Sequence, residues 1–215
     1  MPYRRTDNVS RKLAARHAAI LHAAQALAAE GGMAAVQIAA VAERAGIAAG
    51  TVYRYFPSKM ELVAALVEAR AVAEVAVLRR AAGAAPGPLS ALAAVIASFS
   101  ARVLAHRRLA FALMAEPVEP ELDSARVRFR RVLSAEFEAR IRAAAGHLPK
   151  QDAAIAAPAL LGALIEGLVG PLAPAADHDA TARAQALTLL SLRALGVVDA
   201  RARGLVVQTQ VRVDG

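Results

Sequence analysis

Residues 41–62 read VAERAGIAAGTVYRYFPSKMEL, which contains two short helical patterns separated by one glycine. Gly46 can adopt the positive φ of a tight turn, and the second pattern has to end before Pro57. Apolar residues recur at helical spacing and predict a small core shared by both helices. The predicted core residues are Val41, Ala45, Ile47, Val52 and Phe56. This arrangement is typical of a helix-turn-helix, whose second helix can enter the major groove of DNA.

The remaining side chains of the second helix turn outward and are the candidate DNA contacts. Arg54 can form a bidentate bond to guanine or contact a phosphate, and the sequence favours neither. Ser58 can cap a long helix that begins at Lys59, where an ammonium beside a helix N-terminus suits a phosphate oxygen. The predicted contacts of the second helix are Ala49, Gly50, Thr51, Tyr53, Arg54 and Tyr55.

Together with the preceding helix, these residues resemble the tetracycline-repressor (TetR) family, whose DNA-binding segment typically reads IAxxAGVSxGTxYxYFxSKxxL. The resemblance covers about 50 N-terminal residues. It implies that Thr51, Tyr53 and Tyr55 contact phosphates or base edges and that Lys59 binds a phosphate. Where the family commonly has Ser in the turn and Thr before the helix at 38–45, this chain has Ala48 and Gln37. A helix cap and two phosphate contacts are therefore expected to be missing.

Positive charge is concentrated at the N-terminus. The formal net charge is +8, and residues 1–60 hold eight Arg or Lys against three Asp or Glu. We expect Arg4, Arg5 and Arg11 to contact phosphates or the minor groove, although a solvated tail explains them equally well. The chain has no cysteine, which excludes disulfides and thiolate metal sites. No cofactor and no metal are predicted.

Hydrophobic periodicity and Gly/Pro punctuation predict an all-α fold of about nine helices. It comprises an N-terminal three-helix DNA-binding domain and a C-terminal helical bundle for ligand sensing and dimerisation. The predicted helices cover 10–30, 38–45, 49–55, 59–80, 89–105, 107–115, 120–145, 151–171 and 180–195. The predicted domains are 1–58, which includes a basic arm, and 59–200, with a loosely ordered tail at 201–215. Within the tail, LVVQTQVRV alternates enough to form a strand, but a single strand would be unstable.

Large side chains are rare in the C-terminal half, where alanine dominates. Phe99, Phe111, Met114, Phe129 and Phe137 could line a pocket for a small ligand or simply fill the core, and the pattern supports both equally. Arg102 lies among apolar residues. It could face an anionic group of a ligand, but the pattern favours a surface arginine.

Two apolar helices, 151–171 and 180–195, would leave much apolar surface exposed in a monomer. They predict a four-helix bundle with a second copy of the chain. The stretch 153–176 is apolar but is interrupted by Glu166, prolines and glycines, so it indicates a buried helix rather than a membrane span. With no signal peptide in the sequence, a cytoplasmic location without membrane contact is expected. The predicted interface residues are Leu161, Ile165, Leu168, Leu187 and Leu190.

The sequence therefore predicts a dimeric regulator that binds operator DNA and is released by a small apolar or amphipathic ligand. Repression is expected from the family resemblance alone. The alternative is a protein that coats DNA without sequence preference or ligand response. An enzyme is not expected, because the five histidines lack the spacing of metal ligands and no nucleophile motif accompanies them.

Overall fold

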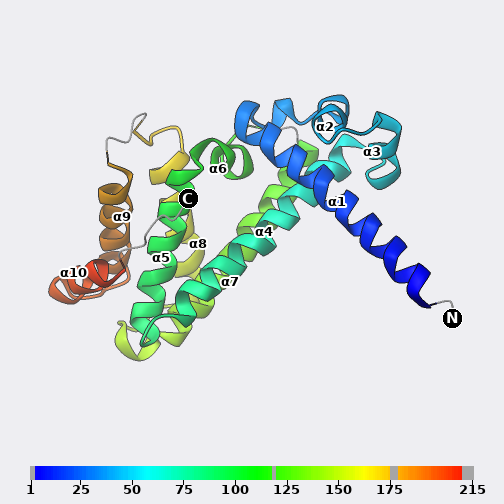
Figure 1. The fold of residues 1–215 in the computed structure, drawn as a ribbon. Helices are drawn as coiled ribbons and strands as arrows, with labels where there is room; N and C mark the ends of the chain where they lie inside the picture. Colours follow the sequence, from blue (N-terminus) through cyan, green and yellow to red (C-terminus); the bar gives the residue numbers. More distant parts are fainter. Residues whose placement is uncertain (1–2, 118–119, 175–178, 210–215) are drawn as a thin grey trace.

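The computed structural model describes residues 3–117, 120–174 and 179–209 and is all-helical over these ranges, with ten α-helices, two short 3₁₀ turns and no strand (Figure 1). The predicted fold class is confirmed, and most predicted helix boundaries agree to within a few residues. The α-helices are α1 (Tyr3–Gly31), α2 (Ile38–Arg44), α3 (Ala49–Tyr55), α4 (Lys59–Gly83), α5 (Pro88–Ala105), α6 (Arg107–Met114), α7 (Pro120–Ala143), α8 (Ala153–Val169), α9 (Ala180–Ala194) and α10 (Asp199–Gln208). The 3₁₀ turns are η1 (Met33–Ala35) and η2 (Ala145–His147).

Helices α1 to α3 form a small unit at one end of the molecule. The second half of α1 packs on α2, and its residues Ile20 and Ala24 are fully buried. An ion pair of 2.6 Å between Arg44 of α2 and Glu30 of α1 joins the two helices at the surface. It lowers the pKa of the Glu30 carboxyl, chiefly through the hydrogen bond from Arg44. The compact part of the unit therefore starts near Ile20.

The first half of α1 projects away from this unit into solvent (Figure 1). Leu13 lies two helical turns before the buried Ile20, but its side chain is 52% exposed. The reason is that α1 begins at Tyr3 rather than at Ser10 and runs past the helices that could cover it. What the sequence presents as a basic arm is thus the exposed half of a helix.

The remaining helices form a bundle around α5. Leu92, Ile96 and Phe99 of α5 are buried almost completely, and α4, α7, α8, α9 and α10 pack against this helix. Helix α5 is long and apolar enough to cross a membrane, but most of it is enclosed by the bundle. Its composition therefore fits the central helix of a packed domain.

The segment after Gly196 differs from the prediction. Instead of a loose tail or a strand, α10 packs on α5 and α9. Ala202 and Leu205 are buried one helical turn apart, and Asp199 in the first turn pairs with Arg193 of α9 and with Arg203. Residues 205–208 of the alternating stretch thus belong to α10, whose buried side carries Ala202 and Leu205. Residues 210–215 of the predicted tail lie outside the described residues.

Two connections join the N-terminal unit to the bundle. Helix α4 continues from one to the other, and α6 packs against α1 (Figure 1). Just after α6, the Glu116 carboxylate accepts a hydrogen bond of 2.9 Å from the backbone N–H of Met33. The adjacent Gly32 has φ of 73°, and a Cβ there would lie 2.7 Å from a Glu116 oxygen. A glycine at this position thus permits the carboxylate to reach the backbone.

Candidate functional site

The α2–turn–α3 segment has the expected helix-turn-helix geometry. Gly46 has a φ of 65°, as the tight turn requires. Val41, Val52 and Phe56 are buried, and Ala45 and Ile47 pack against them, so the predicted small core is confirmed. This core fixes which side of α3 faces outward.

The outward side of α3 carries short residues and two long ones. Ala49 and Gly50 are exposed, as are Arg54 and Tyr53, whose side chain is 52% exposed. Thr51 is half-buried at the edge of this face. Among the described side chains of α3, Tyr53 and Arg54 are therefore long enough and exposed enough to contact a DNA duplex.

Tyr55 is half-buried and lies against α1. Its ring centroid is 6.3 Å from that of His17, which also lies 5.0 Å from the ring of Phe56. The sequence reasoning gave His17 no role. Its position one helical turn before the buried Ile20 was the available signal, since residues three apart share a helix face.

Helix α4 starts beside α3 with a defined cap. The Ser58 hydroxyl accepts a hydrogen bond of 3.1 Å from the backbone N–H of Glu61, as predicted. Lys59, the first residue of α4, is half-buried. The free N–H groups of this first turn and the ammonium group are suited to bind an anionic oxygen.

The departures from the family pattern have the predicted structural effect. Gln37 and Ala48 occupy the N-cap positions of α2 and α3, and neither side chain caps its helix. The Gln37 amide instead donates a hydrogen bond of 2.9 Å to the Ala34 carbonyl.

The projecting half of α1 extends the positive surface. Arg11, Lys12 and Arg16 are exposed along it. Arg4 and Arg5 lie in the first turns of α1, but their side chains are outside the described part of the structure. Their predicted DNA contacts stay predictions.

A pocket opens between α4, α5, α6 and α7. Four of the predicted pocket residues line it, namely Phe99, Arg102, Met114 and Phe129. Phe111 is on the surface, and Phe137 lies behind the wall, with its ring 5.7 Å from Phe99 in an edge-to-face contact. The cavity has a volume of only about 40 Å³, which is room for a few water molecules.

The interior of this pocket is charged as well as apolar. Arg102 is not a snorkelling surface residue, because its guanidinium donates hydrogen bonds of 3.1–3.2 Å to Glu74 of α4. Arg70, one turn earlier on α4, lies 4.0 Å from the same carboxylate. The sequence could not reveal this cluster, since Glu74 and Arg102 are on different helices.

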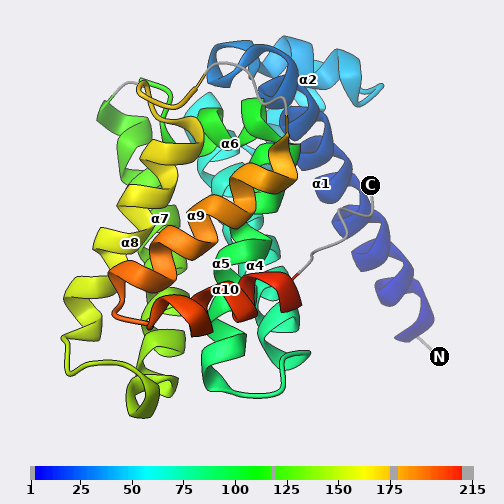
Figure 2. The same cartoon turned by 90° about the vertical axis from the view of Figure 1, so that its left-hand side faces the viewer.

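Helices α8 and α9 lie on the side of the bundle turned away from the projecting half of α1 (Figure 2). Leu161, Ile165 and Leu168 are buried inside the chain itself and face its own core, which corrects their assignment to a surface that a partner could reach. Leu187 is half-buried, and Leu190 is 60% exposed. Ile155, which the sequence reasoning did not single out, is 69% exposed on α8.

Comparison with known proteins places this geometry in a family. The family model described as bacterial regulatory proteins, tetR family, matches residues 20–66. The HTH-type transcriptional repressor KstR of Rhodococcus jostii is 60% identical over 48 residues, and that of Mycobacterium tuberculosis is 56% identical over 48 residues. Residues 20–66 therefore carry the DNA-binding segment of the TetR family.

The match to the curated relatives is confined to one part of the chain. It spans 22% of the chain and 23% of the Rhodococcus jostii repressor. Over nearly the whole chain, the fold is similar to that of solved TetR-family structures. RolR in complex with resorcinol has a TM-score of 0.70 at 23% identity, with 95% of this chain and 100% of that chain covered. The fatty acid degradation regulator FadR from Bacillus halodurans has a TM-score of 0.68 at 20% identity, with 85% and 97% covered. The matched relatives are regulators and not enzymes, in agreement with the sequence-based prediction.

Proposed function

We propose that this protein is a dimeric transcriptional repressor that binds operator DNA through α3 and the start of α4. The observation that carries the proposal is the exposed face of α3, with Tyr53 and Arg54 beside the capped N-terminus of α4. The tetR-family model matches this region, and the 60% identity to the KstR repressor over 48 residues supports repression as the polarity. Backbone N–H groups, hydroxyls and an ammonium would position the duplex, and Arg54 would read a base or bind a phosphate.

We propose that the partner in the dimer is a second copy that covers the exposed side of α8 and α9. On α8 this side presents Ile155, Ala159 and Ala163, which follow one another at four-residue spacing. On α9 it presents Ala186 and Leu190 at the same spacing. Small residues allow helices to approach closely, and a two-fold arrangement would bring both stripes into one four-helix bundle. Leu190 and Leu187 remain in the proposed interface, and Ile155 joins it.

We propose that the pocket receives the ligand that releases DNA. A small-molecule site usually needs about 300–1,000 Å³, so the cavity of about 40 Å³ would have to expand. Its walls include Arg70 and Glu74 of α4, the helix that begins at Lys59. A ligand that binds the expanded state better would shift α4 and change the spacing of the two recognition helices.

The test is DNA binding by the purified protein. We would measure fluorescence anisotropy with the DNA that flanks its own gene, at physiological salt and with excess random duplex. Lys59→Ala should weaken binding about tenfold and lower the salt dependence by about two ions per dimer, because each protomer loses one phosphate contact. Lys150→Ala is the matched control, since Lys150 is exposed on a loop in the bundle far along the chain from α3.

Two results would contradict the proposal. An unchanged affinity of the Lys59 variant would exclude the docking through α4. Equal affinity for the flanking DNA and for random duplex would instead favour the protein that coats DNA without sequence preference, for which the exposed basic half of α1 is suited.

A further inference from the structure

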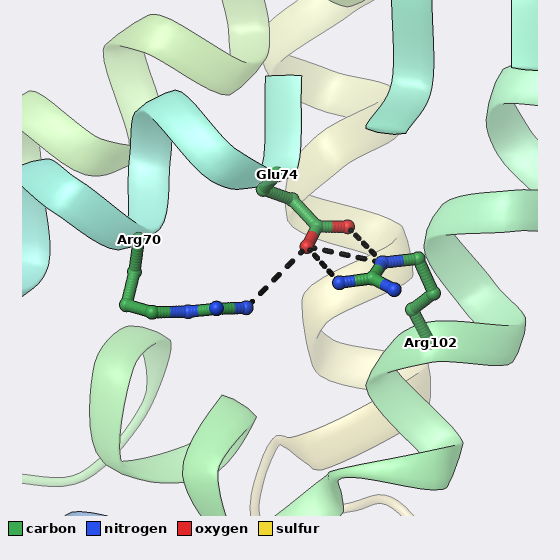
Figure 3. A network of polar contacts seen from close by, with 3 residues as sticks. All are labelled: Arg70, Glu74 and Arg102. Carbon is green, nitrogen blue, oxygen red and sulfur yellow. Dashed lines mark hydrogen bonds and ion pairs between the residues drawn. The ribbon is translucent and has the colours of Figure 1, made fainter. Parts of the chain in front are cut away.

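The polar residues of the pocket form a small cluster of unequal charge (Figure 3). The Glu74 carboxylate, of a residue that is only 8% exposed, faces two guanidinium groups. Arg102 of α5 binds it through Nε and Nη2 at 3.1–3.2 Å. Arg70 of α4 reaches only to 4.0 Å. His106, the other titratable residue in the pocket lining, supplies no negative charge. The cluster therefore holds one more positive charge than negative charge.

The second guanidinium is not fully satisfied within the chain. Arg70 Nε is buried and has no hydrogen-bond partner among the residues that the structure describes. Burial lowers the pKa of Arg70, Glu74 raises it, and the neighbouring positive charge of Arg102 lowers it further. Arginine stays protonated under these conditions, so the group keeps its charge and its unused donor. An anion bound here would balance the charge of Arg70 and accept a hydrogen bond from its unused donor.

The rest of the lining is apolar. Phe99 and Val103 of α5, Leu109 and Leu113 of α6, Met114 at the end of α6 and Phe129 of α7 surround the cluster. An occupant must therefore combine a hydrophobic body with one charged end. A small polar anion would make no contact with these apolar walls. A neutral apolar molecule would leave the charge and the buried donor of Arg70 without a partner.

We propose that the ligand is an amphipathic organic acid whose single carboxylate binds between Arg70 and Arg102. This inference rests on the proposed sensor function of the pocket and specifies its ligand class. A monocarboxylate matches the one excess positive charge, whereas a phosphate dianion would exceed it. Its two oxygens also fit the planar donor pairs of the guanidinium groups. Because Glu74 competes for Arg102, the ligand would loosen the contact between α4 and α5.

The first experiment compares acids with alcohols of the same skeleton. We would titrate the purified protein without DNA by calorimetry, with 4-phenylbutyrate against 4-phenylbutan-1-ol and octanoate against 1-octanol. Each acid should bind about tenfold more tightly or better than its alcohol, because a charged hydrogen-bonded pair adds that much. Equal affinities, tighter binding of the alcohols or absence of saturable binding by both acids would overturn the proposal.

The second experiment uses variants whose effects have opposite signs. Arg70→Gln and Arg102→Gln should each reduce acid binding about tenfold and leave alcohol binding within about twofold. Glu74→Gln should strengthen acid binding, because the internal competitor is gone. It should also lower the melting temperature of the ligand-free protein, and the acid should restore it more than the alcohol does. If Glu74 had a purely structural role, Glu74→Gln would weaken acid binding. That result would overturn the proposal.

Matched controls lie on the same helix. Glu68→Gln and Arg80→Gln change exposed residues of α4 outside the pocket lining and should leave acid binding within about twofold. The DNA titration separates this inference from the proposed function. Acid binding by a protein that does not prefer its operator would leave the ligand class standing and reject the regulator. Operator binding by a protein that shows no preference for acids would leave the regulator standing and reject the ligand class.

Discussion

At the scale of single residues, Gly50 shows how the recognition helix is adapted to an external surface. It lies in the first turn of α3, and a Cβ placed on it would meet no atom within 4 Å. The packing of the protein therefore does not require a glycine, which costs a helix up to about 1 kcal/mol relative to alanine. In the proposed complex, a glycine here permits close approach of the DNA backbone.

Gly50→Ala should accordingly separate stability from binding. We expect the melting temperature to stay or rise by a few degrees, about 1–3 °C, as the helix gains propensity. Operator affinity should fall about tenfold or more, because the added methyl group holds the phosphate away. Gly204→Ala is the control, since Gly204 is also a helical glycine with open space around it, in α10. A Gly50 variant that binds as well as the parent would reject the close approach.

The residue scale also shows what sequence can predict about the site. The burial of Val52 and Phe56 and the exposure of Tyr53 follow from the helical period alone. The contact of His17 with Phe56 and the bond of Arg102 with Glu74 join different helices. Their existence depends on crossing angles and on where each helix begins, which local spacing does not contain.

At the scale of elements, α6 is the short helix that contacts both functional regions. Its residues Leu109 and Leu113 line the pocket, while the helix packs on α1. Glu116, which follows it, holds the Met33 N–H next to the start of α2. Displacement of α6 by a ligand would therefore pull directly on the helix-turn-helix unit as well as through α4.

Glu116→Ala should weaken this connection. The Met33 amide loses its acceptor, so we expect its hydrogen exchange to speed up about tenfold, the effect of about 1.4 kcal/mol. Exchange mass spectrometry on peptides that cover Met33 would measure this, with Glu68→Ala as the control for loss of a glutamate. If protection at Met33 were the same in both variants, the hydrogen bond would contribute nothing to the coupling.

Helix α8 marks the limit of prediction for an element. Its existence and bounds follow from the sequence, but apart from Glu166 it is apolar all round, so periodicity cannot separate the core side from the partner side. For this reason Leu161, Ile165 and Leu168 were assigned to an interface although they fill the core, and Ile155 was missed. In α10 the alternation of valines concealed the helical spacing of Ala202 and Leu205.

At the scale of the whole molecule, the proposed function depends on two copies held at a fixed separation. Two recognition helices must lie about 34–36 Å apart to enter successive major grooves. The α8–α9 face would set this distance, and it lies on the opposite side of the bundle from the exposed half of α1 (Figure 2). Dimerisation and operator affinity should therefore be lost together.

Leu190→Arg tests this link. A charge in the centre of the proposed interface should convert the dimer to a monomer, because it would be buried without a partner. Sedimentation velocity would show the change in mass, and operator affinity should fall by about a hundredfold or more at the same concentration. Val72→Arg is the control, since Val72 lies on α4 and its side chain is about as exposed as that of Leu190. A Leu190 variant that remained dimeric would place the interface elsewhere.

The small volume of the pocket has a consequence for timing. Because about 40 Å³ cannot admit an organic molecule, a ligand would have to wait for the helices around it to separate. The rate of association would then be set by this opening and would level off as the ligand concentration rises. A repressor built in this way would release DNA no faster than its pocket opens, however high the ligand concentration becomes.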